Sequence, residues 1–201
     1  MKIIGLCGGS GSGKGTVSVL FAEYEIPSID TDKVYHELTA SESSCLTALI
    51  NEFGNEIISK EGSLDRKKLG RIVFSGEDSH KKLKKLNEIS HKYVLDETRR
   101  RLDFLREQGY KCAIVDAPVL FESGFDKECD LTVAVLCDKE MRISRIISRD
   151  NISYEAALAR IRSQISDEEL VKRCNFIIYN NSDLDALKQE VKKTVNHIFN
   201  H

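Results

Sequence analysis

A glycine-rich run at positions 8–16, Gly-Gly-Ser-Gly-Ser-Gly-Lys-Gly-Thr, combines residue types that point directly to phosphate chemistry. The spacing from Gly8 through Gly13 to Lys14 is that of a phosphate-binding loop. Glycines let the backbone turn its N–H groups inward around phosphate oxygens, and the lysine adds a positive charge for the outer phosphates. An apolar strand-like run precedes the loop and a helical pattern follows it, which disfavours a merely flexible turn. The sequence therefore predicts a site for a nucleoside triphosphate.

Three aspartates follow predicted strands. Asp30 and Asp32 lie just past the second strand, where residues i and i+2 are expected to point the same way. A carboxylate there can accept a hydroxyl proton or hold Mg²⁺ through water. The alternative, an Asx turn or a helix cap, is less favoured opposite a phosphate loop. Asp116 ends the third strand, where an acidic residue commonly holds the Mg²⁺ shell, the alternative being a turn before proline.

The magnesium ligands depend on the residues after Lys14. Many phosphate loops carry a hydroxyl at the next position, but this chain has Gly15 there and places its hydroxyl at Thr16. We expect Mg²⁺ because triphosphate chemistry needs charge neutralisation. Its ligands are then Thr16, acidic residues such as Asp116, or water.

Arginines form a further candidate group. Arg142, Arg145 and Arg149 follow i, i+3, i+7 spacing and share one helix face, and Arg160 lies on the next helix. In nucleotide kinases such a helical pair forms a lid that closes over the triphosphate and brings cations to the transferring group. The alternative for each arginine is a solvated basic surface, and the spacing alone does not distinguish the two.

These residues need a scaffold, which the apolar pattern supplies. Five short apolar runs are predicted strands: 2–7, 26–29, 112–116, 131–136 and 175–179. Helices are predicted between or after them: 14–23, 46–53, 66–74, 79–106, 139–149, 153–163, one opened by the capping box at Ser166 and one from about 183. This alternation predicts an α/β fold, a P-loop kinase-like parallel five-stranded sheet covered by helices.

The domain organisation follows from the long helical stretch between the second and third strands. We expect a single domain with a core at 1–32 and 110–201, an inserted helical lobe at about 33–109 that binds the acceptor, and a helical lid at about 139–165. In α/β sheets, ligands bind at the carboxyl ends of the strands, where this lobe would emerge.

Composition excludes several classes of partner. The net charge of −2 over 201 residues gives no basic field for nucleic acid. No apolar run approaches the ~20 residues of a membrane span, and no signal peptide is expected from the short N-terminal apolar run. The six cysteines form no CxxC pair and no zinc spacing, so we expect reduced thiols in a cytoplasmic protein. The sequence gives no oligomeric state.

Several longer segments extend these patterns along the chain: IGLCGGSGSGKGT at 4–16, IDTD at 29–32, FGNEI at 53–57, GSLDRKKLGRIVF at 62–74, DAPVLFESGFDKECD at 116–130, SRIISRDNIS at 144–153, ARIRSQ at 159–164 and IIYNN at 177–181. With them the chain resembles the dephospho-CoA kinases nearly end to end. The resemblance implies transfer of the ATP γ-phosphoryl group to the ribose 3′-hydroxyl of dephospho-CoA. Coenzyme A and ADP would be the products, in the last step of coenzyme A synthesis.

The resemblance also implies roles for individual residues. Asp32, Lys14 and Arg145 would be catalytic, with Asp32 beside the attacking hydroxyl. ATP would be bound by Gly11, Ser12, Gly13, Lys14, Gly15, Thr16, Arg149 and Asn180, with Asn180 near the adenine. Substrate would be contacted by Asp30, Asp32, Asp116 and Arg160, and Mg²⁺ by Thr16 and Asp116. The chain departs from the family at Gly15, where serine is usual, and at Arg142, where glutamine is common.

Two alternatives stay open at this stage. Another nucleoside monophosphate or small-molecule kinase is supported by the GKGT form of the loop. A non-catalytic ATP-binding module would not need Asp32, the arginine-rich lid and a large acceptor lobe together. A guanine-binding NKxD-like motif, expected in a GTPase-type switch, is missing from the sequence.

Overall fold

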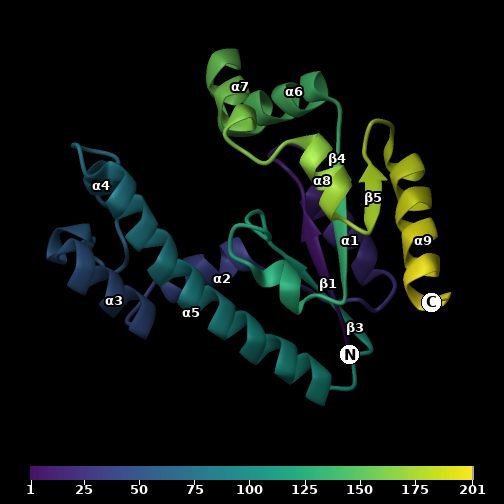
Figure 1. Ribbon diagram of the computed structural model, residues 1–201, viewed down its shortest axis with the longest axis horizontal. Helices are drawn as coiled ribbons and strands as arrows, with labels where there is room; N and C mark the ends of the chain where they lie inside the picture. The colour runs from purple at the N-terminus through teal and green to yellow at the C-terminus, as the bar shows by residue number, and fades with distance from the viewer. Residues whose placement is uncertain (201) are drawn as a thin grey trace. The chain divides into compact units, whose positions relative to one another are not determined.

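The computed structural model describes residues 1–200 and contains a parallel five-stranded sheet with the strand order β2-β3-β1-β4-β5 (Figure 1). The strands are β1 (Lys2–Cys7), β2 (Ser28–Asp30), β3 (Cys112–Asp116), β4 (Leu131–Leu136) and β5 (Phe176–Tyr179). The central strand β1 pairs with β3 on one side and β4 on the other, and β4 pairs with β5. The five-stranded parallel sheet predicted from the sequence is therefore confirmed, although β2 begins two residues later than expected.

The chain divides into two compact units, each with its own apolar core. Unit 1 comprises Met1–Ile29 together with the chain from Leu105 onward, and unit 2 comprises Asp30–Phe104. In unit 1 the helices are α1 (Lys14–Ala22), α6 (Lys139–Asp150), α7 (Tyr154–Arg162), α8 (Asp167–Arg173) and α9 (Leu184–Asn200), with a short 3₁₀ helix η2 (Phe125–Glu128). The long helix α5 (Ser79–Glu107) begins in unit 2 and ends in unit 1.

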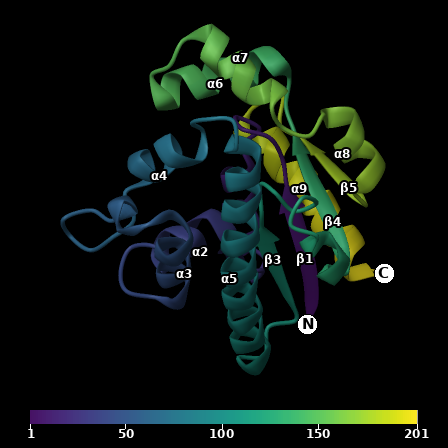
Figure 2. The same cartoon turned by 60° about the vertical axis from the view of Figure 1, so that its left-hand side comes forward.

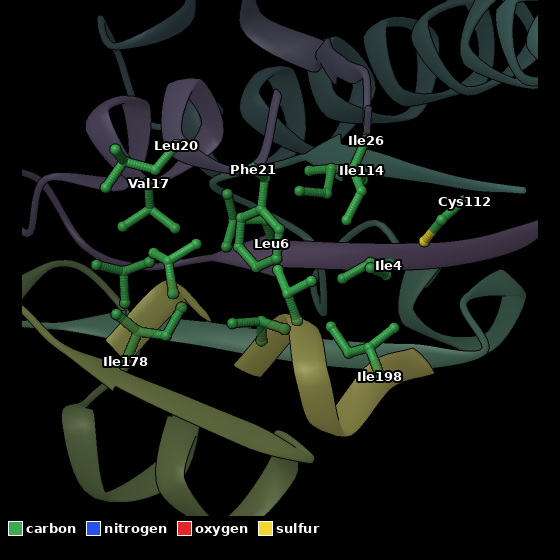
Figure 3. Close-up of a cluster of buried hydrophobic side chains, with 14 of the residues drawn as sticks. Ile4, Leu6, Val17, Leu20, Phe21, Ile26, Cys112, Ile114, Ile178 and Ile198 are labelled. Carbon is green, nitrogen blue, oxygen red and sulfur yellow. The ribbon is translucent and has the colours of Figure 1, made fainter. Parts of the chain in front are cut away.

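The core of unit 1 forms between the sheet and the helices α1 and α9. Figure 3 shows the side chains of α1, among them Phe21, directed at those of β1, among them Leu6. Alternate residues of a strand share a face, so Ile4 and Leu6 both enter this core. On the other face, a Cβ added to Gly5 would come within 2.8 Å of the Leu120 side chain. Helices α1 and α9 thus cover one face of the sheet, and the Leu120 side chain packs closely against β1 on the other.

Helices α6 and α7 pack on each other through a small cluster of their own, which contains Ile143, Ile146 and Ala157 (Figure 2). Asn151, in the left-handed conformation, ends α6, and the Ser153 hydroxyl caps α7 by accepting from the backbone N–H of Ala156 at 3.2 Å. The Ser166 hydroxyl caps α8 in the same way. The helices predicted from the sequence in this region are therefore present.

Unit 2 is helical: α2 (Thr31–Leu38), α3 (Ser44–Phe53), the 3₁₀ helix η1 (Asn55–Ile57), α4 (Arg66–Val73) and the greater part of α5. Its apolar core contains Leu49, Ile57 and Val73, all of them fully buried. The helices predicted at 46–53, 66–74 and 79–106 are confirmed, and α2 is an additional helix that the sequence analysis did not place. Within residues 1–200, the helices that are long enough to cross a bilayer lack the apolar character to do so.

Candidate active site

The phosphate loop, residues 8–13, joins β1 to α1. Gly11 and Gly13 have φ angles of 78° and 92°, a left-handed backbone that side-chain-bearing residues rarely adopt. Ser12 donates its backbone N–H to the Gly9 carbonyl at 3.1 Å, which closes the turn. The loop therefore ends at the N-terminus of α1, where free N–H groups and the helix dipole favour an anion.

Asn180 follows β5 and supports the loop from inside unit 1. Its side-chain Nδ2 donates to the Ser12 carbonyl at 2.8 Å, and its backbone N–H donates to the Leu136 carbonyl at 2.8 Å. A Cβ on Gly13 would overlap the Asn180 amide, which is a second reason for glycine at that position. The Ser12 hydroxyl is buried and has no hydrogen-bond partner within residues 1–200. Adenine contact by Asn180 stays a prediction.

Lys14 is ion-paired with Asp116, the last residue of β3. The Asp116 carboxylate is almost fully buried and accepts a further hydrogen bond from the Ser18 hydroxyl at 3.1 Å. Ser18 lies one helical turn after Lys14, so α1 presents both groups to the same carboxylate. The sequence analysis missed Ser18, although its i+4 spacing from the loop lysine is a signal that could have identified it.

Arg145 is the predicted catalytic arginine, and the structure brings it to the phosphate loop. Its Nη1 donates to the Gly11 carbonyl at 3.2 Å, and its Nη2 donates to the Asn180 carbonyl at 3.4 Å. The guanidinium therefore joins α6 to both the loop and the end of β5. Its position beside the loop is a fact of the fold, and its contact with phosphate stays a prediction.

Arg149 and Arg160 both bind Asp150, the last residue of α6. Arg149 donates from Nε to Oδ1 at 2.7 Å and from Nη2 to Oδ2 at 3.0 Å, and Arg160 of α7 pairs with Oδ2. These charge-assisted hydrogen bonds lower the pKa of the Asp150 carboxyl to about 2, and the bond from Arg149 has the largest effect. The three charges thus link α6 to α7, and phosphate contact by the two arginines stays a prediction.

Asp30 and Asp32 belong to unit 2 and do not share a strand face. Asp30 is the N-cap of α2, and its carboxylate accepts from the backbone N–H of Lys33 at 3.0 Å. Asp32 lies exposed in the first turn of that helix. The expectation that strand alternation points both carboxylates the same way is wrong, because the strand ends at Asp30 and the chain turns helical at once. The helix-cap alternative describes Asp30 correctly.

Arg142 is buried, with its side chain only 4% exposed, although its spacing with Arg145 and Arg149 suggested a common surface. It bonds to Ser10 of the phosphate loop and to two residues that the sequence analysis had not assigned to the site, Gln164 and Asp167. Gln164 closes the ARIRSQ segment and Asp167 opens α8.

The predicted magnesium ligands supply oxygen, the donor that Mg²⁺ prefers. Asp116 offers a buried carboxylate at a strand end, and Thr16 offers an exposed hydroxyl on α1. Within residues 1–200, three or more His, Cys, Asp or Glu side chains nowhere gather as a metal cluster. This donor set fits an ion that keeps several waters and is held mainly by substrate phosphates, as Mg²⁺ commonly is.

A parallel sheet with a glycine-rich loop after its central strand, a lysine on a buried aspartate and arginines from the following helices define a P-loop kinase. Comparisons with known proteins identify the kind of kinase. A family model described as dephospho-CoA kinase matches residues 2–186. The chain is 41% identical over 193 residues to the dephospho-CoA kinase of Fusobacterium nucleatum, covering 96% of each protein.

Two solved structures share the fold over nearly the whole chain, and one of them carries the same family name. The dephospho-CoA kinase from Campylobacter jejuni superposes with a TM-score of 0.71 at 29% identity, covering 98% of both chains. The protein TT1252 from Thermus thermophilus superposes with a TM-score of 0.77 at 30% identity, covering 98% of this chain and 97% of that one. This chain belongs to the dephospho-CoA kinase family, which confirms the resemblance found in the sequence. Members of this family are transferases that use ATP as co-substrate.

Proposed function

We propose that this protein transfers the γ-phosphoryl group of ATP to the ribose 3′-hydroxyl of dephospho-CoA. The observation that carries the proposal is the ion pair of Lys14 with buried Asp116 at the base of a glycine-rich phosphate loop, in a chain of this family. In the reaction, the hydroxyl oxygen bonds to the γ-phosphorus, the bond from phosphorus to the ADP oxygen breaks, and ADP leaves. The hydroxyl proton passes to a carboxylate, which we assign to Asp32.

The loop residues divide the binding of ATP between backbone and side chain. The backbone N–H groups between Gly11 and Thr16 bind the phosphates, except that of Ser12, which closes the turn on Gly9. Lys14 supplies positive charge for the outer phosphates. Arg145, already on the Gly11 carbonyl, adds charge beside the loop. We assign residues 33–109 to acceptor binding and 139–165 to a lid that excludes water, with Arg149 and Arg160 as its phosphate-binding arginines, Asn180 near the adenine and Asp30 at the acceptor.

Thr16 and Asp116 are the residues that would hold Mg²⁺. When bound, the ion neutralises the charge of the triphosphate oxygens. Asp116 is already fixed by Ser18 and Lys14, so the chain holds this carboxylate in one orientation. We place the reaction in the cytoplasm, since the six cysteines are free thiols, which persist in reducing compartments.

The test is a panel of acceptors with Mg-ATP: dephospho-CoA, pantothenate, AMP and dTMP, each assayed for ADP release and for the mass of the product. We expect ADP release and a product of the mass of coenzyme A with dephospho-CoA alone. Phosphorylation of AMP or dTMP in its place would indicate a nucleotide kinase. ATP binding without turnover of any acceptor would indicate a binding module.

A further inference from the structure

Ser10, in the middle of the phosphate loop, is held at three of its atoms by two side chains. Its backbone N–H donates to Gln164 Oε1 at 2.9 Å, and its hydroxyl accepts from Gln164 Nε2 at 3.2 Å. Its carbonyl accepts from Arg142 Nε at 3.0 Å. A single amide thus clamps one side of Ser10 and a guanidinium clamps the other.

The two clamping residues are themselves joined. Arg142 Nη2 donates to Gln164 Oε1 at 3.3 Å, and Arg142 Nη1 donates to Asp167 Oδ1 at 3.0 Å. The buried guanidinium would be costly without such partners, and here each of its three nitrogens has one. Ser10, Arg142, Gln164 and Asp167 therefore form one connected network of hydrogen bonds.

Two loop glycines make room for Arg142. A Cβ on Gly9 would overlap the Arg142 guanidinium, and a Cβ on Gly11 would lie 2.6 Å from the Arg142 carbonyl oxygen. Part of the glycine content of the loop therefore serves close packing against α6, in addition to the turn itself. From the sequence pattern alone, all of the loop glycines are assigned to phosphate binding.

The network ties the loop to three helices. Arg142 comes from α6, Gln164 follows the end of α7, and Asp167 opens α8. One turn further along α6, Arg145 binds the Gly11 carbonyl at 3.2 Å. The loop is consequently bonded to α6 at both Ser10 and Gly11, and Ser10 is bonded in addition to Gln164, which follows α7.

We propose that Arg142 and Gln164 are positioning residues for ATP: by fixing Ser10 they hold the following N–H groups in the phosphate-binding arrangement. The proposal rests on the proposed function only for the identity of the phosphoryl donor. Neither residue touches the acceptor in this account, so their loss weakens ATP binding and leaves acceptor binding unchanged. A residue that only stabilised the fold would lower the melting temperature and the active fraction without changing either KM.

The test compares Arg142→Met and Gln164→Leu with Lys192→Met, a control that removes an exposed cation of α9, outside the residues assigned to the site. The KM for ATP and the calorimetric Kd for a non-hydrolysable ATP analogue should rise about ten- to a hundredfold in the first two variants, the loss expected for buried hydrogen bonds to a charged group. The KM for dephospho-CoA should stay the same, and Lys192→Met should match the parent protein. Arg142→Lys keeps the charge but not the planar set of donors, so its Kd should fall between those of Arg142→Met and the parent.

The double variant Arg142→Met/Gln164→Leu completes a double-mutant cycle with the two single variants and the parent protein. Because both residues act on Ser10, its Kd should rise by less than the product of the two single effects. An unchanged Kd for the ATP analogue in folded Arg142→Lys and Gln164→Leu would overturn the proposal, as would equal rises in the KM of both substrates. A parent protein that is inactive on dephospho-CoA would refute the proposed function. The positioning role of Arg142 and Gln164 would still be decided by the Kd values, because calorimetry with the ATP analogue needs no acceptor.

Discussion

Lys14 owes its position to Asp116, because the ion pair fixes a long flexible side chain at the carboxyl end of β3. A charge held in this way needs little rearrangement to act on the outer phosphates, which is where preorganised electrostatics contribute most. The same carboxylate binds Ser18, so the strand end, the loop and the first two turns of α1 are one bonded unit.

Lys14→Ala should fold normally and lose turnover by at least about two orders of magnitude, the effect of removing one preorganised charge contact. Steady-state ADP release measures turnover, and circular dichroism verifies the fold. Lys192→Met, which removes an exposed lysine of unit 1 outside the assigned site, is the matched control. Near-normal turnover in folded Lys14→Ala would refute the phosphate-loop assignment.

Asp32→Asn should lower turnover on dephospho-CoA by about 10²–10⁴-fold, the range of a general base, since a ribose hydroxyl is a poor nucleophile. The amide keeps the size of the side chain, so the Kd of the ATP analogue should not change. Asp30→Asn serves as the comparison, because Asp30 caps α2 and an asparagine caps almost as well. Equal turnover of Asp32→Asn and the parent protein would exclude Asp32 as the base.

Gly15→Ser tests the magnesium assignment. A Cβ at Gly15 meets no atom within 4 Å, so the structure has room for the side chain. Serine is also the better helix former, and it adds a hydroxyl directly after Lys14. The Mg²⁺ concentration for half-maximal rate should therefore fall, with melting temperature unchanged or raised. A Mg²⁺ requirement that is unchanged or higher would show that position 15 does not contribute to the metal site.

Sequence reasoning worked best where the signal is local. The strands and most helices were predicted correctly because each segment shows its own apolar periodicity, as Ile4 and Leu6 do in β1. Sequence reasoning failed where the same residue fits two different structural roles. Asp30 is both the last residue of β2 and the N-cap of α2. Asp32 therefore lies on α2, although the sequence analysis expected it on an extension of the strand. Arg142 has the spacing of a surface arginine, and only the tertiary partners Gln164 and Asp167 reveal that it is buried.

At the scale of elements, α6 and α7 form a hairpin that is held by a small apolar cluster and by a charge triad. The cluster contains fully buried Ile146 and Ala157, and the triad consists of Arg149, Asp150 and Arg160. Because the apolar cluster is small, the hairpin is expected to open locally at low free-energy cost. The charge triad is then the contact that a single substitution can remove.

Asp150→Asn should accelerate hydrogen exchange across 139–162 without affecting α9, because it removes the charge that both arginines bind. In the parent protein the folded pKa of Asp150, about 2, lies below its unfolded value. The stabilisation is therefore complete above the unfolded pKa near 4 and is lost as the pH falls through about 2. An NMR titration of the carboxyl in that window measures the shift. Parent-like exchange in Asp150→Asn would show that the apolar cluster and the Arg142 network hold the hairpin without the charge triad.

At the scale of the whole molecule, each of the two units has an apolar core of its own. Leu6 of the first and Leu49 of the second are both fully buried, so they offer a matched pair of substitutions. All phosphate-loop contacts described above lie within unit 1, from Ser10 to Asn180. The division of labour predicted from the sequence, with acceptor binding in the helical lobe, can thus be tested by damaging one core at a time.

Leu49→Ala and Leu6→Ala should each lower the free energy of unfolding by about 2–5 kcal/mol, the cost of a large-to-small change in a core. The functional consequences should differ. Leu49→Ala should keep the parent Kd for the ATP analogue and raise the KM for dephospho-CoA, because unit 2 loosens while the phosphate loop keeps its support. Leu6→Ala, in the strand that leads into the loop, should weaken ATP binding first. Calorimetry with the analogue and melting followed by circular dichroism measure both effects. Equal loss of ATP binding in the two variants would show that the units unfold as one cooperative structure, with no separate acceptor lobe.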